Sequence, residues 1–183
     1  MIDGKPAYVY YVSPTQINVL SPADTAQGSV PVQVTYAGKT SNTLNATQET
    51  YAPALFTLSP LGQKYVAATH ADGSYVGPTN LYPGLTTPVQ PGETIVLYGT
   101  GFGPTTPSTN VGQTFSGAPL IPIPPSATIG GFFATVLWPG LVAPGEYQFN
   151  IVVPYGPQSG DNPVLLTVFG GPSSQPNAYL TVQ

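Results

Sequence analysis

Apolar and β-branched residues occur along this chain in short runs, and Gly and Pro separate the runs from one another. The clearest runs are residues 7–12, 94–98, 147–153 and 164–169. A Pro destabilises the interior of a helix by about 3 kcal/mol and a Gly by about 1 kcal/mol, so 23 Pro and 21 Gly leave few windows for a helix. Short strands with turn residues roughly every eight to twelve positions are typical of a β-sandwich. The pattern therefore predicts an all-β fold.

One stretch of this pattern occurs twice. Residues 16–22 (QINVLSP) match residues 148–154 (QFNIVVP) at an offset of 132 residues (148 − 16), and the same offset aligns Gly28 with Gly160. Further matches on either side pair residues 5–11 with 132–138 and residues 41–47 with 175–181. We interpret the matches as one structural unit present in two copies.

The two copies differ in what comes before them. Residues 51–131 precede the second copy and include a predicted hairpin at Asp72-Gly73, whereas only residues 1–4 precede the first. The first copy holds about four predicted strands, against about seven in an immunoglobulin-like sandwich. We therefore predict tandem immunoglobulin-like β-sandwiches, with an incomplete N-terminal one in residues 1–50 and a complete one in residues 51–183.

An incomplete sandwich exposes an apolar face and unpaired sheet edges. An upstream part of a larger protein would cover them, as would direct packing of residues 1–50 on the second unit. Strands from a neighbouring subunit are the third alternative, and repeated head to tail they build a filament. Because side chains alternate along a strand, Tyr8 and Tyr10 are expected on one face and Tyr11 on the other. The residues predicted at the interface are Tyr8, Tyr10, Val12, Ile17 and Val19.

Several motifs occur in an order that resembles a known family. They are residues 91–104 (PGETIVLYGTGFGP), 129–131 (IGG), 145–150 (GEYQFN), 11–18 (YVSPTQIN) and 52–57 (APALFT). Over essentially its whole length the chain resembles the Solibacter-type C-terminal domain, a module at the ends of large secreted acidobacterial proteins. The resemblance implies tandem immunoglobulin-like folds, export across the inner membrane and an extracellular or cell-surface location in a bacterium. It implies no catalytic residues.

Charge is scarce, with 5% of residues charged and a formal net charge of −4. Three Lys and no Arg cannot neutralise successive phosphates, which excludes nucleic acid as a partner, and they are too widely spaced for a polybasic membrane anchor. Gly and Pro interrupt the uncharged stretch between Glu93 and Glu146, so we expect no membrane insertion. The lack of cysteine excludes a disulfide framework and a thiolate zinc site.

Residues suited to catalysis are sparse. His70 is the only histidine, and its position before the Asp72-Gly73 turn indicates a solvent-facing strand residue rather than a catalytic or metal-binding one. Glu93 and Glu146 would suit glycoside hydrolysis if they met in space, but both follow Pro-Gly, which favours turns at strand entries. We therefore expect no enzyme activity, no cofactor and no metal site.

The chain is rich in tyrosine, with 12 Tyr beside 7 Phe and one Trp. Exposed tyrosines stack on sugar rings or fill protein interfaces. A carbohydrate-binding accessory module of a larger secreted protein is therefore the alternative function. Trp138 is expected to fill the sandwich core.

Attached glycans would keep such an uncharged surface hydrated. Asn45 lies in an Asn-Ala-Thr sequon, and two clusters of Ser, Thr and Pro are typical of O-glycosylated loops. The candidate residues are Asn45, Thr105, Thr106, Ser108, Thr109, Ser173 and Ser174.

These patterns predict a non-catalytic structural or interaction module outside the cell. Its sheet edges and apolar faces would associate, and a neighbouring subunit would supply the strands that the N-terminal unit lacks. The expected product is a cell-surface or matrix filament. The shortage of charge supports association, because charges on edge strands commonly prevent it.

Overall fold

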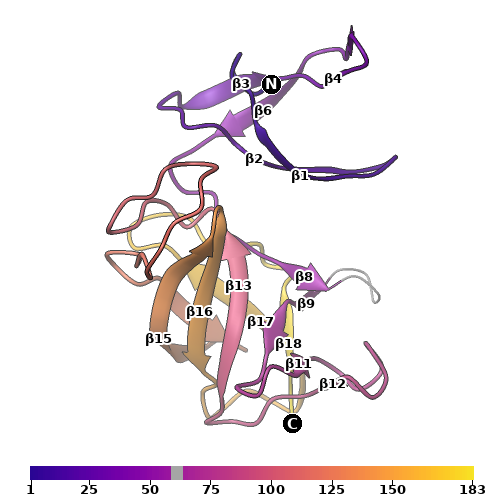
Figure 1. Ribbon diagram of the computed structural model, residues 1–183. Coiled ribbons are helices and arrows are strands. Elements are labelled where there is room, and N and C mark those ends of the chain that lie inside the picture. Colours follow the sequence, from indigo (N-terminus) through magenta and orange to yellow (C-terminus); the bar gives the residue numbers. More distant parts are fainter. Residues whose placement is uncertain (59–63) are drawn as a thin grey trace. The chain divides into compact units, whose positions relative to one another are not determined.

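The computed structural model describes residues 1–58 and 64–183 (Figure 1). Every helix or strand position assigned within these residues belongs to a β-strand, so the all-β prediction is confirmed. Gly and Pro interrupt each apolar run before a helix can form. Accordingly, the described part of the chain contains no helix long and apolar enough to cross a membrane.

The chain divides into two compact units. The N-terminal unit comprises Met1–Thr50 and Thr109–Ser116, and the C-terminal unit comprises Tyr51–Ser108 and Gly117–Gln183. Residues 109–116 thus belong with the N-terminal unit, although they follow the first strands of the C-terminal one.

The N-terminal unit contains three antiparallel strand pairs. They are β1 (Tyr8–Val12) with β2 (Ile17–Leu20), β3 (Gly28–Val32) with β6 (Leu44–Gln48), and β4 (Thr35–Tyr36) with β5 (Lys39–Thr40). In this unit, which the structure describes in full, Val30 is the one apolar residue that is buried. The unit therefore has regular strands but hardly any core.

The C-terminal unit is built around one curled sheet of twelve described strands (Figure 1). Its hydrogen-bonded order is β12-β11-β10-β13-β16-β15-β14-β17-β18-β9-β8, and β7 pairs with β13. The strands are β7 (Ala54–Leu55), β8 (Thr57–Leu58), β9 (Tyr65–Val66), β10 (Ala68–Thr69), β11 (Tyr75–Val76), β12 (Thr86–Thr87), β13 (Thr94–Thr100), β14 (Ser126–Ile129), β15 (Phe132–Ala143), β16 (Glu146–Val152), β17 (Gly160–Thr167) and β18 (Tyr179–Val182). Buried and half-buried residues alternate along β13 and β16, as expected of strands with one face on a core.

The repeat in the sequence is also a repeat of backbone structure. The β1–β2 and β15–β16 hairpins pair in the same register, and both have a β-bulge at the same position. The equivalent pairs are Val9↔Val19 with Val136↔Ile151, Tyr11↔Asn18 with Trp138↔Asn150, and Val12↔Ile17 with Pro139↔Phe149. The offsets are 127 residues on the first strand (136 − 9) and 132 on the second (151 − 19), the same offsets that align the two sequences.

The strands that follow the hairpins repeat as well. β3 pairs with β6 as β17 pairs with β18, so that Gly28↔Gln48 corresponds to Gly160↔Val182. The next turn repeats too, since Val34 N–H donates to the Ser41 hydroxyl at 3.1 Å and Leu166 N–H donates to Ser174 at 3.1 Å. The two copies thus share a continuous run of strands and turns.

The turn before each hairpin is also equivalent. Asp3 has a φ of 48° and Gly130 a φ of 60°, both in the left-handed region. Asp3 N–H donates to the Pro31 carbonyl at 2.9 Å, and Gly130 N–H donates to the Pro163 carbonyl at 2.9 Å. The N-terminal unit therefore begins its copy of the pattern within the counterpart of β14.

Candidate functional site

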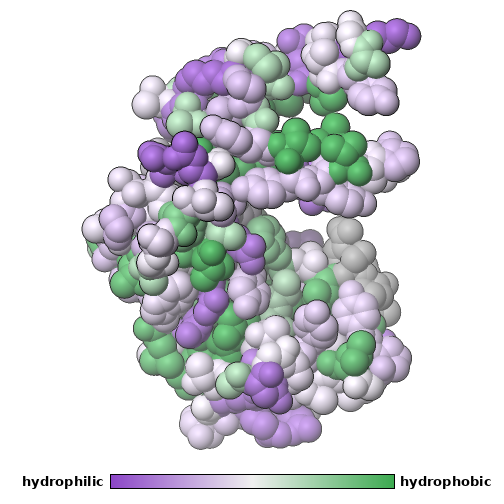
Figure 2. All heavy atoms as spheres, in the orientation of Figure 1, coloured by the Kyte–Doolittle hydropathy of each residue, from purple (hydrophilic) through white to green (hydrophobic). Residues whose placement is uncertain are grey.

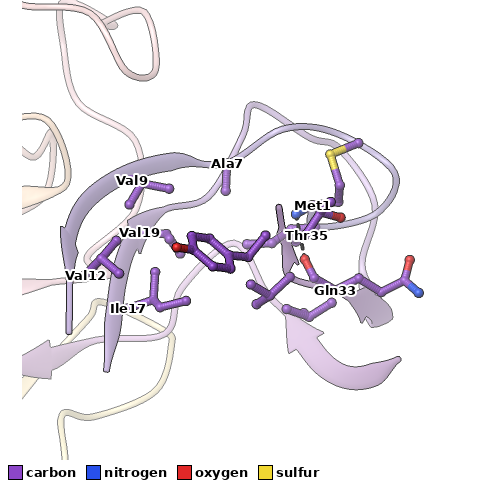
Figure 3. Close-up of a pocket in the computed structure, with 12 residues that line it drawn as sticks. Met1, Ala7, Val9, Val12, Ile17, Val19, Gln33 and Thr35 are labelled. Carbon is purple, nitrogen blue, oxygen red and sulfur yellow. Dashed lines mark hydrogen bonds between the residues drawn. The ribbon is translucent and has the colours of Figure 1, made fainter. Parts of the chain in front are cut away.

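An apolar cavity of about 390 Å³ lies within the N-terminal unit (Figure 3). It is lined by Met1, Ile2, Ala7, Val9, Val12, Ile17, Val19, Val32, Gln33, Val34, Thr35 and Tyr36. None of these residues has a charged side chain. A cavity of this size and character is of the kind that buries an apolar group of a ligand or partner.

One side of the cavity is formed by the aliphatic face of the β1–β2 hairpin, which consists of Val9, Val12, Ile17 and Val19. Cross-strand partners point to the same side of a sheet, and Val9 pairs with Val19 while Val12 pairs with Ile17. In Figure 3 these four side chains lie across the cavity from Met1 and Thr35.

The β-bulge decides which residues belong to this face. Without a bulge, Val9 and Val12 would point to opposite sides, because they are three positions apart. The bulge between Val9 and Tyr11 adds one residue and brings them to the same side. Of the five predicted interface residues, Val12, Ile17 and Val19 line the cavity, whereas Tyr8 and Tyr10 do not. The prediction that Tyr8 and Tyr11 lie on opposite faces is wrong, because it assumed regular alternation and the bulge brings both to the same side.

Tyrosines occupy the opposite side of the hairpin. Tyr8 and Tyr11 pair with Leu20 and Asn18, and both tyrosines are exposed. Trp138 takes the position of Tyr11 in the second copy and is half-buried on that side. The prediction that Trp138 fills the core is therefore wrong, and the bulge is again the reason.

The aliphatic face is exposed where its counterpart in the second copy is buried. Ile17 is 41% exposed and Val19 is 43% exposed, whereas their equivalents Phe149 and Ile151 are 0% exposed. Val9 and Val12, at 60% and 65%, are more exposed still. Figure 2 shows strongly hydrophobic side chains at the surface over β1. Exposed apolar patches of this kind mark interaction sites on soluble proteins.

The hairpin also has an open edge. In the C-terminal unit β16 lies between β15 and β13, and Ile95 and Leu97 of β13 pair with Ile151 and Phe149. In the N-terminal unit β2 pairs with β1, and none of the described strands pairs with its other edge. Backbone N–H and C=O groups along that edge are therefore free to bond another strand.

Polar contacts beside the cavity hold the N-terminal unit together. The Met1 ammonium donates to the Gln33 carbonyl at 2.8 Å, and Gln33 N–H donates to the Met1 carbonyl at 3.0 Å. Lys5 lies 3.0 Å from Asp24. A hydrogen bond from the Ala26 N–H, with a further one from Lys5, lowers the pKa of Asp24 below its ordinary value. The carboxylate therefore stays ionised at neutral pH.

The proposed glycan acceptors differ in how far their side chains are exposed to solvent. Thr105 is 8% exposed and its hydroxyl donates to the Pro107 carbonyl, while Ser174 is 3% exposed and accepts from Leu166 N–H. Burial counts against these two positions, because an acceptor hydroxyl must be reachable. Thr109 is half-buried. The exposed candidates, which stay predictions, are Asn45, Thr106, Ser108 and Ser173.

The sequence predicted that His70 faces solvent, but the structure shows it largely covered. Its side chain is 13% exposed, with Nδ1 against the Glu93 carboxylate and Nε2 3.0 Å from the Thr87 hydroxyl and 3.2 Å from the Thr87 carbonyl. Both ring nitrogens are therefore engaged by neighbouring protein groups. The cluster therefore acts as a clamp between β10, β12 and the entry to β13.

Glu93 and Glu146 do not meet. Glu93 immediately precedes β13 and Glu146 begins β16, and these strands are antiparallel, with Thr94 opposite Val152 and Gly99 opposite Tyr147. At about 3.4 Å per residue the two carboxylates are separated by roughly 20 Å along the sheet. Paired-carboxylate hydrolysis needs a separation of roughly 5 to 10 Å. The structure thus does not bring these two residues together.

The C-terminal unit also contains an ion pair that the first copy lacks. Lys64 lies 2.8 Å from Asp161, which also accepts hydrogen bonds from Tyr65 and Thr181. Burial raises the pKa of Asp161, but these three donors outweigh it and hold the pKa below its ordinary value. Within residues 1–58 and 64–183 no group of three or more His, Asp or Glu is placed to hold a metal ion.

Comparison with known proteins gives no match: no family model, no curated protein and no solved structure is similar to this chain. The resemblance to the Solibacter-type C-terminal domain therefore stays a prediction from the motifs. The internal repeat allows the two copies within this chain to be compared with each other.

Proposed function

We propose that this protein is a non-catalytic interaction module that acts outside a bacterial cell. Its N-terminal unit accepts a β-strand from a neighbouring subunit, and repetition of that contact builds a filament at the cell surface or in a matrix. The observation that carries the proposal is the contrast at equivalent positions: Ile17 and Val19 are exposed, whereas Phe149 and Ile151 are buried.

Burial of the aliphatic face supplies the driving force. Complete burial of a Val or Ile side chain contributes about 1.5–3 kcal/mol, and the face presents four such side chains in one patch. The open edge of β2 adds backbone hydrogen bonds, which fix the direction of the incoming strand. The cavity lining carries no charged side chain to oppose association.

We also propose the finer fold on which this function depends. Each unit follows an immunoglobulin-like sandwich, and the N-terminal one is incomplete until the incoming strand is added. The repeated hairpin, bulge and turn support this view. The location outside the cell rests on the motif resemblance and on the low content of charge.

Electron microscopy and sedimentation test the proposed function. Protein purified from its natural source is expected to form filaments in negative stain and to sediment more rapidly as its concentration rises. The variant Ile17→Asp should abolish both, because it places a charge on the aliphatic face. The matched variant Tyr11→Ala alters the opposite side of the same hairpin and should leave assembly intact. Monodisperse globular particles at all concentrations would refute the filament.

A second candidate function rests on the tyrosine side of the hairpin. Tyr8, Tyr10 and Tyr11 are 44%, 57% and 51% exposed on one short strand, and exposed tyrosine rings stack on sugars. A carbohydrate-binding module would lose glycan-array binding in Tyr11→Ala and keep it in Ile17→Asp. The two functions thus predict opposite responses to the same pair of variants.

A further inference from the structure

We propose that the outer face of the C-terminal sheet binds a neutral polysaccharide, through aromatic rings and a pair of amide side chains that lie in one row. The row runs across β15, β16, β13, β10 and β11, which are neighbours in the sheet. Figure 1 shows β15, β16 and β13 side by side. The site is separate from both sides of the β1–β2 hairpin. The inference therefore goes beyond the proposed function and does not depend on filament formation.

Strand register places the row on one face of the sheet. The residues that pair in succession from β15 to β11 are Trp138, Asn150, Val96, Thr69 and Tyr75. Cross-strand partners point to the same side of a sheet. The adjacent residues Leu97 and Ile151 point to the other side, where both are 0% exposed, so the row lies on the side away from the core. Four strand spacings of about 4.8 Å put roughly 19 Å between its ends, a length that suits a chain of sugars rather than a single ring.

Two amide side chains beside Trp138 orient each other. Gln148 Nε2 donates to Asn150 Oδ1 at 2.8 Å, which leaves the Asn150 amide NH₂ as a donor and Gln148 Oε1 as an acceptor. In the described part of the chain, Asp24 Oδ2 is the one buried side-chain polar atom without a partner. The free amide atoms of Asn150 and Gln148 are therefore open to solvent. A sugar hydroxyl can both donate and accept, so this pair matches what it requires.

The Trp138 ring lies alongside the amide pair. Gly140 follows two residues later on β15 and pairs with Gln148. A Cβ added to Gly140 would lie 2.5 Å from Trp138 Cη2, so the ring extends along the strand over a residue that has no side chain. Tyr98 pairs with Gln148 from the opposite strand, β13. Aromatic residues thus flank the amides on both neighbouring strands.

A further aromatic group occupies the far end of the row. Tyr75 is 47% exposed, and its ring centroid lies 6.3 Å from that of Tyr82. Tyrosine and tryptophan combine a flat apolar ring with a polar group, which suits them to stacking on the C–H faces of sugars. Trp138 and Tyr75 would hold the two ends of a bound sugar chain, and the amides between them would select its hydroxyl groups.

Charge selects the class of polysaccharide. The paired residues of the row have no charged side chains, and Glu146 follows the amides on the same face of β16, two positions from Gln148. Of the three Lys in the chain, two belong to the N-terminal unit and Lys64 pairs with Asp161. A polysaccharide with carboxylate or sulfate groups would therefore find no cation on this face and would be repelled by Glu146. A neutral polysaccharide has no such cost.

The first copy contains the same aromatic and amide arrangement. Tyr11 takes the position of Trp138 and pairs with Asn18, and Gln16 Nε2 donates to Asn18 Oδ1 at 2.5 Å. These residues lie opposite the aliphatic face, where packing of a core does not require them. Their presence in both copies supports a binding role. The N-terminal unit has no strands in the positions of β13, β10 and β11, so its version of the site is short and should bind more weakly.

Affinity electrophoresis of the full chain tests the site. Native gels contain hydroxyethylcellulose, galactomannan or dextran as neutral probes, and polygalacturonate or alginate as acidic ones. At least one neutral probe should retard the chain, and the acidic probes should not. Trp138→Ala and Tyr75→Ala should each raise the dissociation constant at least tenfold. The matched variant Tyr155→Ala removes a tyrosine that is 81% exposed in the same unit but outside the row, and it should leave retardation unchanged.

Tryptophan fluorescence gives a direct reading of the site, because Trp138 is the one Trp in the chain. A hexasaccharide of the retarding polysaccharide should shift the emission and reduce quenching by acrylamide. Asn150→Ala should weaken this response at least tenfold, whereas Asn18→Ala in the first copy should leave it unchanged. Trp138→Phe keeps a flat ring and should recover in gels most of the affinity that Trp138→Ala loses. That recovery separates stacking from a loss of folding.

Several results would overturn the inference. They are an absence of retardation by all three neutral probes, stronger retardation by the acidic probes, and retardation without any change in Trp138 emission. Loss of retardation in Tyr11→Ala alone would assign sugar binding to the hairpin and would also overturn it. Ile17→Asp, which tests the filament, should keep full retardation. The filament and the polysaccharide site can therefore fail independently.

Discussion

The β1–β2 and β15–β16 hairpins share one backbone and differ in what covers them. Both have the same register and the same bulge, yet Phe149 packs against Phe102 with ring centroids 4.5 Å apart, while its equivalent Ile17 faces an open cavity. Strand pairing is a local property that a repeated sequence reproduces. Burial depends on distant segments, and only the C-terminal unit has them.

The covering segment is the stretch from β7 to β13, which has no counterpart in the N-terminal unit. It contributes Leu55, Val66, Ile95 and Leu97 to the core. Apart from Val30, every buried apolar residue in the described parts of the chain lies in the C-terminal unit. Stability should therefore be distributed very unevenly between the two units.

Truncation of the equivalent core positions should show the largest difference. Phe149→Ala should lower the free energy of unfolding of the C-terminal unit by about 3–5 kcal/mol, because it leaves a cavity in a packed core. Ile17→Ala should lower that of the N-terminal unit by less than about 1 kcal/mol, because the side chain is already largely exposed to water. Urea unfolding followed by the amide resonances of each unit measures both values. Equal losses in the two units would contradict the contrast.

The turns before the hairpins should respond differently to a side chain. Gly130→Ala should destabilise the C-terminal unit by about 2 kcal/mol, because a Cβ there lies 2.5 Å from the buried Asn162 Oδ1 and the φ of +60° is left-handed. Asp3 already holds a side chain at the same turn, so Asp3→Ala should change the N-terminal unit by less than about 1 kcal/mol. Thermal unfolding of each variant checks the difference. A larger loss from Asp3→Ala would show that the two turns are not equivalent.

The Tyr147 hydroxyl should give the C-terminal unit a response to alkaline pH. Burial raises the pKa of Tyr147 to about 12, and its hydroxyl donates to the Gly103 carbonyl. The neutral Tyr147 hydroxyl stabilises the fold fully below the ordinary pKa of about 10, and this stabilisation is lost as the pH rises towards 12. Tyr147→Phe should lower stability by about 1 kcal/mol at neutral pH and remove the loss between pH 10 and pH 12. Denaturation curves at several pH values measure this, and an unchanged alkaline loss would point to another group.

The Asp161 cluster should give the smallest effect and the opposite pH dependence. The pKa of Asp161 is lowered, so its contribution is present above the ordinary carboxyl pKa and is lost as pH falls through the lower value. At pH 7, Asp161→Asn should lower the free energy of unfolding by about 1 kcal/mol or less, because Lys64 is partly exposed. In strong acid the substitution should leave the free energy of unfolding unchanged. The equivalent of Asp161 in the first copy is Ser29, and Ser29→Ala provides the matched control with no such pH dependence. A cost that persists in acid would mean that packing, and not charge, is lost.

Local chemistry made much of this molecule predictable. Gly and Pro at short intervals prevent helices, so the all-β class followed from spacing. The repeat was visible because equivalent strands keep their apolar residues two positions apart, and the alignment of residues 16–22 with 148–154 carries the same offset as the observed pairing. Of the predicted interface residues, Ile17 and Val19 lie in that repeated stretch.

Tertiary structure decided what no local pattern expresses. The bulge turned Tyr8 and Tyr10 away from the cavity and brought Val9 into it, because one inserted residue reverses the alternation of a strand. His70 and Glu93 meet although they are 23 residues apart, and Thr105 and Ser174 are buried by contacts from elsewhere in the chain. Above all, the same hairpin is a core element in one unit and an open surface in the other. Backbone pairing depends on neighbours in sequence, whereas burial depends on which other strands are present to exclude water.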